Sequence, residues 1–284
     1  MNMTLGKSLI SLTMALVTFQ ANSIVIRHDV EDSKYQASIK DFPPLATLYK
    51  IGVHGTLIDP SWVVTAGHGI FCVENGDTIK VENQFAEVET RYTHSGYLNG
   101  DENDIALIKL KTPITNIEPA KLYRSSDEAT QNIWFIGSGA AGTGLTGQTD
   151  PAISGNKGLL RKAENKIEKT SQKELFFVFD KGDNALPLEG VSGNADSGGP
   201  AYKVIDGQYY VYGVSSRADS PTLNVGEYGV TEIYSRISYH ASWIDKVVAG
   251  DRAFIKNYTT QYHFAQGNIK DNLPAVCNKI GFES

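Results

Sequence analysis

The sequence predicts an all-β protein, folded as barrels or as a sandwich. From Ile24 to about Gly250, short runs of β-branched and aromatic residues alternate with Gly, Pro, Asn and Asp, a pattern typical of many short strands joined by turns. The clearest runs are residues 62–66, 105–108, 133–136, 175–179 and 209–214. The sequence shows no fixed-period repeat and no low-complexity tract.

One helix is predicted after the strands. Apolar and aromatic residues of the segment 240–248 recur at spacings of three and four, and Gly250 stands where such a helix would be capped. Residues 251–284 follow as a C-terminal extension of mixed polarity. Its aromatic residues predict that it packs against the body of the protein; they are Phe254, Tyr258, Tyr262 and Phe264.

The glycine-rich stretch 137–144 invites comparison with phosphate-binding loops. It lacks the lysine of the GxxxxGK[ST] motif and the strand–loop–helix setting that such a loop requires. We therefore expect a flexible surface loop at this place.

Composition and charge narrow the classes of partner. The chain has 284 residues, enough for one large domain or for two small ones that share a core. Its formal net charge of −6 offers no cationic surplus to displace counterions, so no nucleic-acid partner is expected. No polybasic stretch marks a surface for docking to an anionic membrane.

Residues 1–23 predict a secretory signal peptide. Lys7 precedes a short apolar run, and Ala21 and Ser23 place small residues at the −3 and −1 positions of a cleavage site. A retained membrane anchor is the alternative, although the apolar run is short for a bilayer span. We expect a secreted protein, extracellular or periplasmic, with no membrane contact after signal cleavage.

The two cysteines, Cys72 and Cys277, can pair with each other. Export leads to an oxidising compartment, in which a disulfide between them would tie the C-terminal extension to the region just after His68. The alternative is a pair of unpaired buried thiols. Spacing alone does not decide between these.

Three short segments carry the residue types of nucleophilic catalysis. Residues 65–68 end in His68, residues 103–108 contain Asp104, and residues 193–200 contain Ser197. A serine hydroxyl needs a base to take its proton, imidazole titrates near neutral pH, and a buried carboxylate fixes the imidazole tautomer. Each segment alone is compatible with an ordinary strand end or turn. Together, in the order His, Asp, Ser, they predict a catalytic triad.

These segments resemble the motifs of the chymotrypsin/trypsin family. That family carries TAAHC around its histidine, DIAL around its aspartate and GDSGGP around its serine; here the same places read TAGHG, DIAL and ADSGGP. The resemblance covers a protease domain over residues 24–250. It implies two six-stranded antiparallel β-barrels, at about 24–126 and 127–238, followed by the helix. His68 and Asp104 would come from the first barrel and Ser197 from the second.

The resemblance implies a secreted serine endopeptidase that acts on protein or peptide substrates, as a monomer and without metal or cofactor. Few cysteines and a simple prepeptide favour a bacterial type over a vertebrate one. Two alternatives stay open. The same fold can serve as a catalytically weak or inactive pseudoprotease that acts as a binding module, and the same triad can serve an esterase.

The resemblance also implies an activation step. Signal cleavage after Ser23 would expose Ile24, whose new ammonium group would insert beside Asp196, the residue before the nucleophile. A buried carboxylate needs such a cation, and the ion pair would shape the oxyanion loop. The alternative is cleavage elsewhere, with Ile24 simply beginning a strand.

The oxyanion hole departs from the family pattern. By resemblance it uses the backbone N–H groups of Ser197 and Ala195, and the family has glycine at the second position. Alanine still donates an N–H, but its Cβ restricts the backbone. We therefore expect a hole that is imperfect, or flipped before substrate binds.

The specificity pocket departs as well. By resemblance, six residues line it: Val191, Ser192, Ser215, Ser216, Arg217 and Glu232. Val191 stands where trypsin has an aspartate, and Ser215 is expected to hydrogen-bond near Asp104. Arg217 is expected at a glycine position, where it would narrow the pocket or attract an acidic side chain. Glu232 would either neutralise Arg217 or hold a basic residue.

Overall fold

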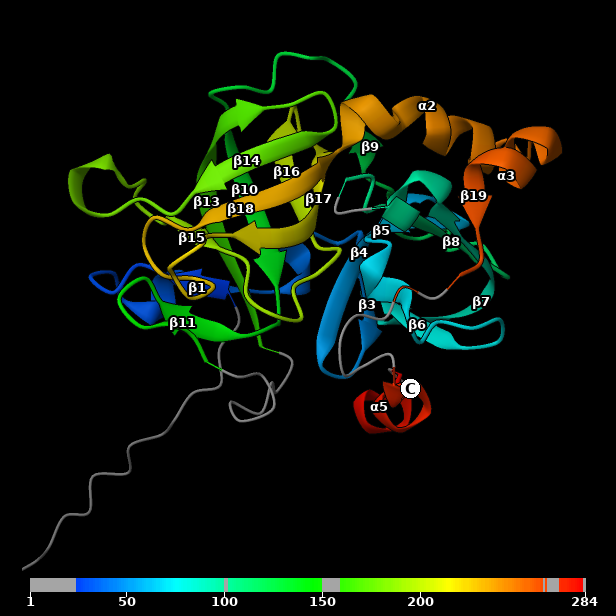
Figure 1. Cartoon of the computed structure of the whole chain (residues 1–284), viewed down its shortest axis with the longest axis horizontal. Helices are drawn as coiled ribbons and strands as arrows, with labels where there is room; N and C mark the ends of the chain where they lie inside the picture. The colour runs from blue at the N-terminus through cyan, green and yellow to red at the C-terminus, as the bar shows by residue number, and fades with distance from the viewer. Residues whose placement is uncertain (1–23, 100–101, 150–158, 263, 265–270, 283–284) are drawn as a thin grey trace, which may run out of the picture.

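The computed structural model describes residues 24–99, 102–149, 159–262, 264 and 271–282 (Figure 1). The predicted signal peptide, residues 1–23, lies outside the described residues. Two β-barrels lie side by side, and the polar site described below is assembled where they meet.

The first barrel is a closed ring of six antiparallel strands in the order β7-β6-β3-β4-β5-β8, closed by pairing of β7 with β8. Its strands are β3 (Leu45–Tyr49), β4 (Gly52–Asp59), β5 (Trp62–Thr65), β6 (Thr78–Val81), β7 (Gln84–His94) and β8 (Ala106–Leu110). Burial of their inward-facing aliphatic side chains supplies its core, which contains Leu48, Val63, Ile79 and Ile108.

The second barrel is also closed, in the order β10-β16-β17-β18-β14-β13, with β10 pairing back to β13. Its strands are β10 (Asn132–Gly137), β13 (Leu160–Thr170), β14 (Glu174–Val178), β16 (Pro200–Ile205), β17 (Gln208–Asp219) and β18 (Thr231–Arg236). The short strands β2 (Gln36–Ala37) and β9 (Lys121–Leu122) pair at its periphery, with β13 and β17. Its core is rich in aromatic side chains, among them Phe135, Phe177 and Tyr234, whose rings contact one another.

This architecture confirms the predicted fold class of two six-stranded antiparallel barrels and a C-terminal helix. That helix, α2 (Ile237–Val248), buries Trp243, Ile244 and Val247. Gly250 follows it with φ of +72°, a conformation that glycine adopts at little cost. Short 3₁₀ helices occupy connecting segments: η1 (Asp32–Lys34), η2 (Ile39–Asp41), η3 (His68–Ile70), η4 (Ser95–Asn99) and η5 (Gly182–Asn184).

The N-terminal segment belongs to the second barrel, although its sequence precedes the first. β1 (Ile24–Ile26) pairs with β11 (Ala141–Thr143) and β15 (Gly190–Val191) in a small sheet that β12 (Gly147–Gln148) completes. Ile24, Ile26 and Tyr35 bury their side chains in the core of the second barrel. The predicted range 24–126 for the first barrel therefore begins too early.

The glycine-rich stretch 137–144 is not the flexible surface loop that we expected. It includes the end of β10 and all of β11, and most of its residues are buried. A Cβ on Gly137 or Gly139 would overlap the Asp196 side chain. The glycines are therefore required for close packing around a buried carboxylate, which composition alone did not indicate.

The C-terminal extension packs against the first barrel, as its aromatic residues predicted. After α3 (Arg252–Tyr258), β19 (Thr259–Thr260) pairs with the end of β7, and α5 (Leu273–Ile280) lies against the same barrel. A disulfide joins Cys277 of α5 to Cys72, so the predicted bridge is confirmed and the alternative of two free thiols is wrong. In the described part of the chain, no helix combines the length and apolarity needed to cross a membrane.

Candidate active site

A chain of hydrogen bonds joins the three residues predicted to carry the chemistry. His68 begins η3 just after β5, Asp104 precedes β8, and Ser197 lies in the loop before β16. The His68 Nδ1 atom lies 2.6 Å from Asp104 Oδ2, and His68 Nε2 lies 2.7 Å from Ser197 Oγ. The two barrels thus bring together side chains that are up to 129 residues apart in sequence.

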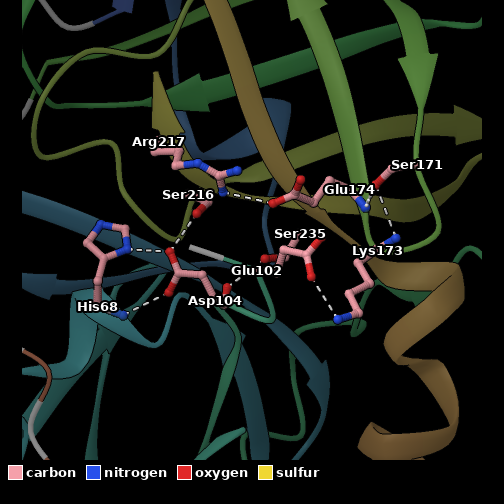
Figure 2. A network of polar contacts seen from close by, with 9 residues as sticks. All are labelled: His68, Glu102, Asp104, Ser171, Lys173, Glu174, Ser216, Arg217 and Ser235. Carbon is pink, nitrogen blue, oxygen red and sulfur yellow. Dashed lines mark hydrogen bonds and ion pairs between the residues drawn. The ribbon is translucent and has the colours of Figure 1, made fainter. Parts of the chain in front are cut away.

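The Asp104 carboxylate is 1% exposed and receives hydrogen bonds from both barrels (Figure 2). The backbone N–H of His68 donates to Oδ1 at 2.9 Å, and the Ser216 hydroxyl donates to Oδ2 at 2.7 Å. The Ser235 hydroxyl donates to the Asp104 carbonyl at 2.7 Å. These bonds fix the orientation of a carboxylate that burial alone would destabilise.

The environment of His68 favours its charged form. Burial of the ring lowers the pKa of His68, but the negative charge and hydrogen bond of Asp104 outweigh that effect and hold the pKa above its usual value. Because the carboxylate holds the proton on Nδ1, neutral His68 presents Nε2 as an acceptor toward the Ser197 hydroxyl.

The serine beside Asp104 is Ser216, and the prediction that Ser215 takes this place is wrong. A β-bulge in β17 between Ser215 and Arg217 shifts the register by one residue. The Ser215 backbone instead pairs with Gly198 and Gly199. Arg217, next after Ser216, therefore does not occupy the glycine position that we had assigned to it.

Arg217 and Glu232 do not form the ion pair that was one of our two expectations. The Arg217 guanidinium donates to Glu174 Oε1 at 2.8 Å, as Figure 2 shows. Glu232 is 2% exposed, and its Oε1 atom has no hydrogen-bond partner in the described part of the chain. Burial, with a smaller contribution from the charge of Asp196, raises the pKa of Glu232 well above its usual value.

The remaining residues of the predicted pocket separate into two environments. Ser192 Oγ lies 2.5 Å from the Tyr234 hydroxyl, which the Ser215 side chain also contacts. Tyr234 and Glu232 lie two residues apart on β18 and so face the same side of the sheet. The Val191 side chain packs elsewhere, against Val25 and Phe179. Ser192 and Ser215 therefore contact the face of β18 that carries Tyr234 and Glu232. Val191 belongs to a different cluster.

Asp196 is buried beneath the loop that carries Ser197. Its carboxylate accepts hydrogen bonds from the N–H groups of Gly139 (2.6 Å) and Gly193 (3.0 Å), and from that of Ile24. Burial outweighs these bonds and raises the pKa of Asp196 to about 7. His54 lies nearby, with Nε2 at 3.9 Å from Asp196 Oδ1, but that nitrogen accepts the Ser138 N–H and burial lowers the pKa of His54 to about 4. Neutral His54 therefore does not balance the charge of Asp196.

The loop before Ser197 holds an alanine in a left-handed conformation. Ala195 has φ of +70°, and its carbonyl accepts the Val53 N–H at 2.5 Å. Among the described residues, the N–H groups of Ala195 and Ser197 donate no hydrogen bond, whereas those of the flanking Asn194 and Asp196 do. The two free donors are separated by a single residue, an arrangement compatible with binding an oxyanion.

Sequence reasoning overlooked the residues that support these groups. Asn103 adopts φ of +62° directly before Asp104, a conformation that asparagine tolerates better than most residues. Ser235 and Gly139 also gave no motif signal. In the described part of the chain, no group of three or more His, Cys, Asp or Glu side chains is arranged to hold a metal ion.

Fold and site together define a two-barrel protein with a Ser–His–Asp hydrogen-bond chain, and comparisons with known proteins place it in a family. The trypsin family model matches residues 32–244. The chain belongs to the trypsin family of serine-type endopeptidases.

Several curated proteins are similar over most of this chain. The chymotrypsin-like elastase family member 1 of Rattus norvegicus is 28% identical over 216 residues, covering 69% of this chain and 78% of the relative. The factor V activator of Macrovipera lebetinus is 25% identical over 268 residues, covering 84% and 98%. The serine protease SSP1 of Scolopendra subspinipes is 26% identical over 229 residues, covering 71% and 76%. These relatives are animal proteins and give no support to the predicted bacterial type.

The coupling between Asp104 and His68 can be measured directly. Asp104→Asn is expected to lower the pKa of His68 below its ordinary value, because the ring stays buried while the carboxylate charge is lost. An NMR titration of the His68 ring measures this pKa. Glu102→Gln is the matched control, because that exposed neighbour pairs with Lys173 and should leave His68 unchanged. A pKa that stays raised in Asp104→Asn would contradict this account of the site.

Proposed function

We propose that the protein is a secreted serine endopeptidase that hydrolyses peptide bonds through Ser197, His68 and Asp104. The observation that carries the proposal is the unbroken hydrogen-bond chain from Asp104 through His68 to Ser197, at 2.6 and 2.7 Å. Membership of the trypsin family supports protein or peptide substrates. The predicted signal peptide and the Cys72–Cys277 disulfide support export to an oxidising compartment.

The proposed reaction is a two-step acyl transfer. Ser197 Oγ attacks the peptide carbonyl carbon as its proton moves to His68 Nε2, and His68 then gives that proton to the leaving amine. Water, deprotonated by the same nitrogen, releases the acyl group and restores Ser197. Asp104 orients the ring and stabilises the imidazolium. Because His68 must be neutral to accept the proton, activity should rise as the pH passes upward through its raised pKa.

Two backbone N–H groups are proposed to stabilise the oxyanion, those of Ala195 and Ser197. Both are free of hydrogen bonds among the described residues, and Ala195 already holds a left-handed conformation. That conformation costs an alanine about 1–2 kcal/mol relative to its preferred regions. The surrounding contacts offset this cost before substrate arrives. This supports a catalytic protein over the inactive binding module, which was the alternative suggested by Ala195.

The test of the central proposal is hydrolysis of a peptide library by the wild-type protein, Ser197→Ala, His68→Ala and the double variant. Each single variant should lose about 10⁴–10⁶ in kcat, and the double variant should lose no more, because the side chains act as one unit. An ester substrate is assayed in parallel. Ester cleavage without peptide cleavage would favour the esterase alternative, and loss of neither activity in the variants would contradict the mechanism.

We also propose that cleavage before Ile24 activates the protein. The Ile24 N–H already donates to Asp196, a carboxylate whose pKa burial raises to about 7 and which neutral His54 does not balance. A free ammonium at that nitrogen would place a cation in direct contact with this carboxylate. Ile24 also has φ of +60°, which β-branched residues rarely adopt, and removal of Ser23 would abolish this restriction.

A chain that begins one residue before Ile24 tests this activation step. We expect its kcat/KM to fall at least about 10-fold, because the ammonium no longer reaches Asp196 and the oxyanion loop loses support. A chain with Ile24→Val at its first position is the control and should keep its activity. Equal activity of the extended and natural chains would disprove the activation step.

For specificity, we propose that Glu232 receives a cationic side chain of the substrate. Arg217, the cation considered as its partner, is paired with Glu174, and one Glu232 oxygen has no hydrogen-bond partner among the described residues. Its carboxyl shares a face of β18 with Tyr234, whose hydroxyl contacts Ser192 and Ser215. A lysine or arginine side chain entering between these segments would favour the charged form of Glu232 and donate a hydrogen bond to its carboxylate.

The Glu232→Gln variant distinguishes a carboxylate that binds a cationic substrate side chain from one that is only buried. We expect kcat/KM for substrates cleaved after lysine or arginine to fall about 10- to 100-fold, while that for a leucine analogue changes little. The variant keeps the size of the side chain and removes only its capacity for charge. If the ratio of kcat/KM for basic substrates to kcat/KM for the leucine analogue is unchanged in the variant, Glu232 does not bind a cationic side chain.

A further inference from the structure

Tyr49 of β3 holds the turn that carries His68. Its side chain is fully buried, and its hydroxyl donates to the Gly69 carbonyl at 2.8 Å and accepts the Cys72 N–H at 3.2 Å. Gly69 follows His68 directly, and both belong to η3. The Tyr49 hydroxyl therefore bonds both the beginning of the turn, at Gly69, and its end, at Cys72. These two bonds fix the turn to β3 of the first barrel.

The C-terminal extension clamps Tyr49 and the same turn from outside. The ring of Phe282 packs edge-on against Tyr49 with centroids 5.3 Å apart, and the two residues form an isolated β-bridge. The disulfide from Cys277 of α5 reaches Cys72, the residue whose N–H Tyr49 accepts. Leu273 and Ile280 of α5 pack on the first-barrel core. The extension therefore contacts both the hydroxyl-bearing ring and the end of the turn.

A second attachment joins the extension to the strand that leads toward Asp104. Thr259 and Thr260 of β19 pair with His94 and Thr93 of β7. One further residue along, the Gln261 carbonyl accepts from Arg91 Nη2 at 3.0 Å. The extension is thus attached at two places: to the end of β7, which precedes Asp104 in the chain, and to Tyr49 and Cys72 beside the turn that carries His68.

The residues that the extension contributes to these contacts lie beyond the part of the chain that matches the trypsin family, which ends at residue 244. The family motif TAAHC has a cysteine directly after its histidine, and this chain has Gly69 at that position. Cys72 lies three residues further on and is bridged to the extension instead. The support beside His68 is therefore supplied by a segment added after the family domain.

We propose that the C-terminal extension is a brace that positions His68, with Tyr49 as the positioning residue and the Cys72–Cys277 disulfide as the lock. This inference rests on the proposed function, because it assigns His68 as the base. The brace does not touch substrate. It acts by restricting the turn that aims His68 Nε2 at Ser197, so its loss lowers the rate of the chemical step and leaves substrate affinity unchanged.

Tyr49→Phe is the most direct test, because it removes the hydroxyl and keeps the ring that packs on Phe282. We expect kcat to fall about 10-fold with KM unchanged, since small displacements of a catalytic group cost rate steeply. The His68 Nδ1 proton should also exchange faster with water in NMR spectra. Tyr212→Phe is the matched control: it removes a hydrogen bond from an equally buried tyrosine of the second barrel, to Gln131, and should change neither readout.

The lock is tested by Cys72→Ser with Cys277→Ser, and by mild reduction of the wild-type protein. Both should lower kcat in the same direction as Tyr49→Phe, and reduction should add little to a chain that already lacks the hydroxyl. If kcat and the His68 proton are unchanged in Tyr49→Phe and after reduction while only the melting temperature falls, the extension is structural and the proposal is overturned. An inactive wild-type protein would refute the proposed function. The brace would still be tested in that case, because exchange of the His68 Nδ1 proton is measured without turnover.

Discussion

The site depends on one buried carboxylate, that of Asp104, at the junction of the two barrels. His68 approaches it from the first barrel, and the Ser216 hydroxyl donates to it from the second, where the Ser235 hydroxyl also donates to the Asp104 backbone carbonyl. A charge that is 1% exposed is tolerated only when such donors are in place. The donors exist only when both barrels are folded and correctly juxtaposed. The hydrogen-bond chain to Ser197 is therefore a consequence of the packing between barrels.

Two other buried carboxyl groups, those of Asp196 and Glu232, meet the same electrostatic problem in different ways. Asp196 is surrounded by backbone N–H groups and retains a pKa of about 7 because burial outweighs them. One oxygen of Glu232 has no hydrogen-bond partner among the described residues, and burial raises the pKa of Glu232 well above its usual value. Asp104 has donors on both oxygens and a histidine ring beside it. These differences fit three roles: orienting a base, receiving a new terminus and recognising substrate.

The fold class, the late helix and the three central residues could all be predicted from the sequence, because short apolar runs and local motifs report on local structure. The details that depend on tertiary packing could not. β13 carries Arg161 and Asn165 at buried positions, so it lacks the apolar alternation of a recognisable strand. The β-bulge that places Ser216, and not Ser215, beside Asp104 has no signature in the local sequence. The need for glycine at 137 and 139 is evident only from their close packing against Asp196.

The central claim is that Ser197 is a nucleophile activated by His68 and Asp104, and a serine-directed fluorophosphonate tests it most directly. The purified protein beginning at Ile24 is exposed to the reagent, and the adduct is located by mass spectrometry. We expect one adduct per chain, at Ser197, and none in His68→Ala, because an unactivated hydroxyl does not react. A folded protein that remains unlabelled, or that is labelled at another serine, would contradict it.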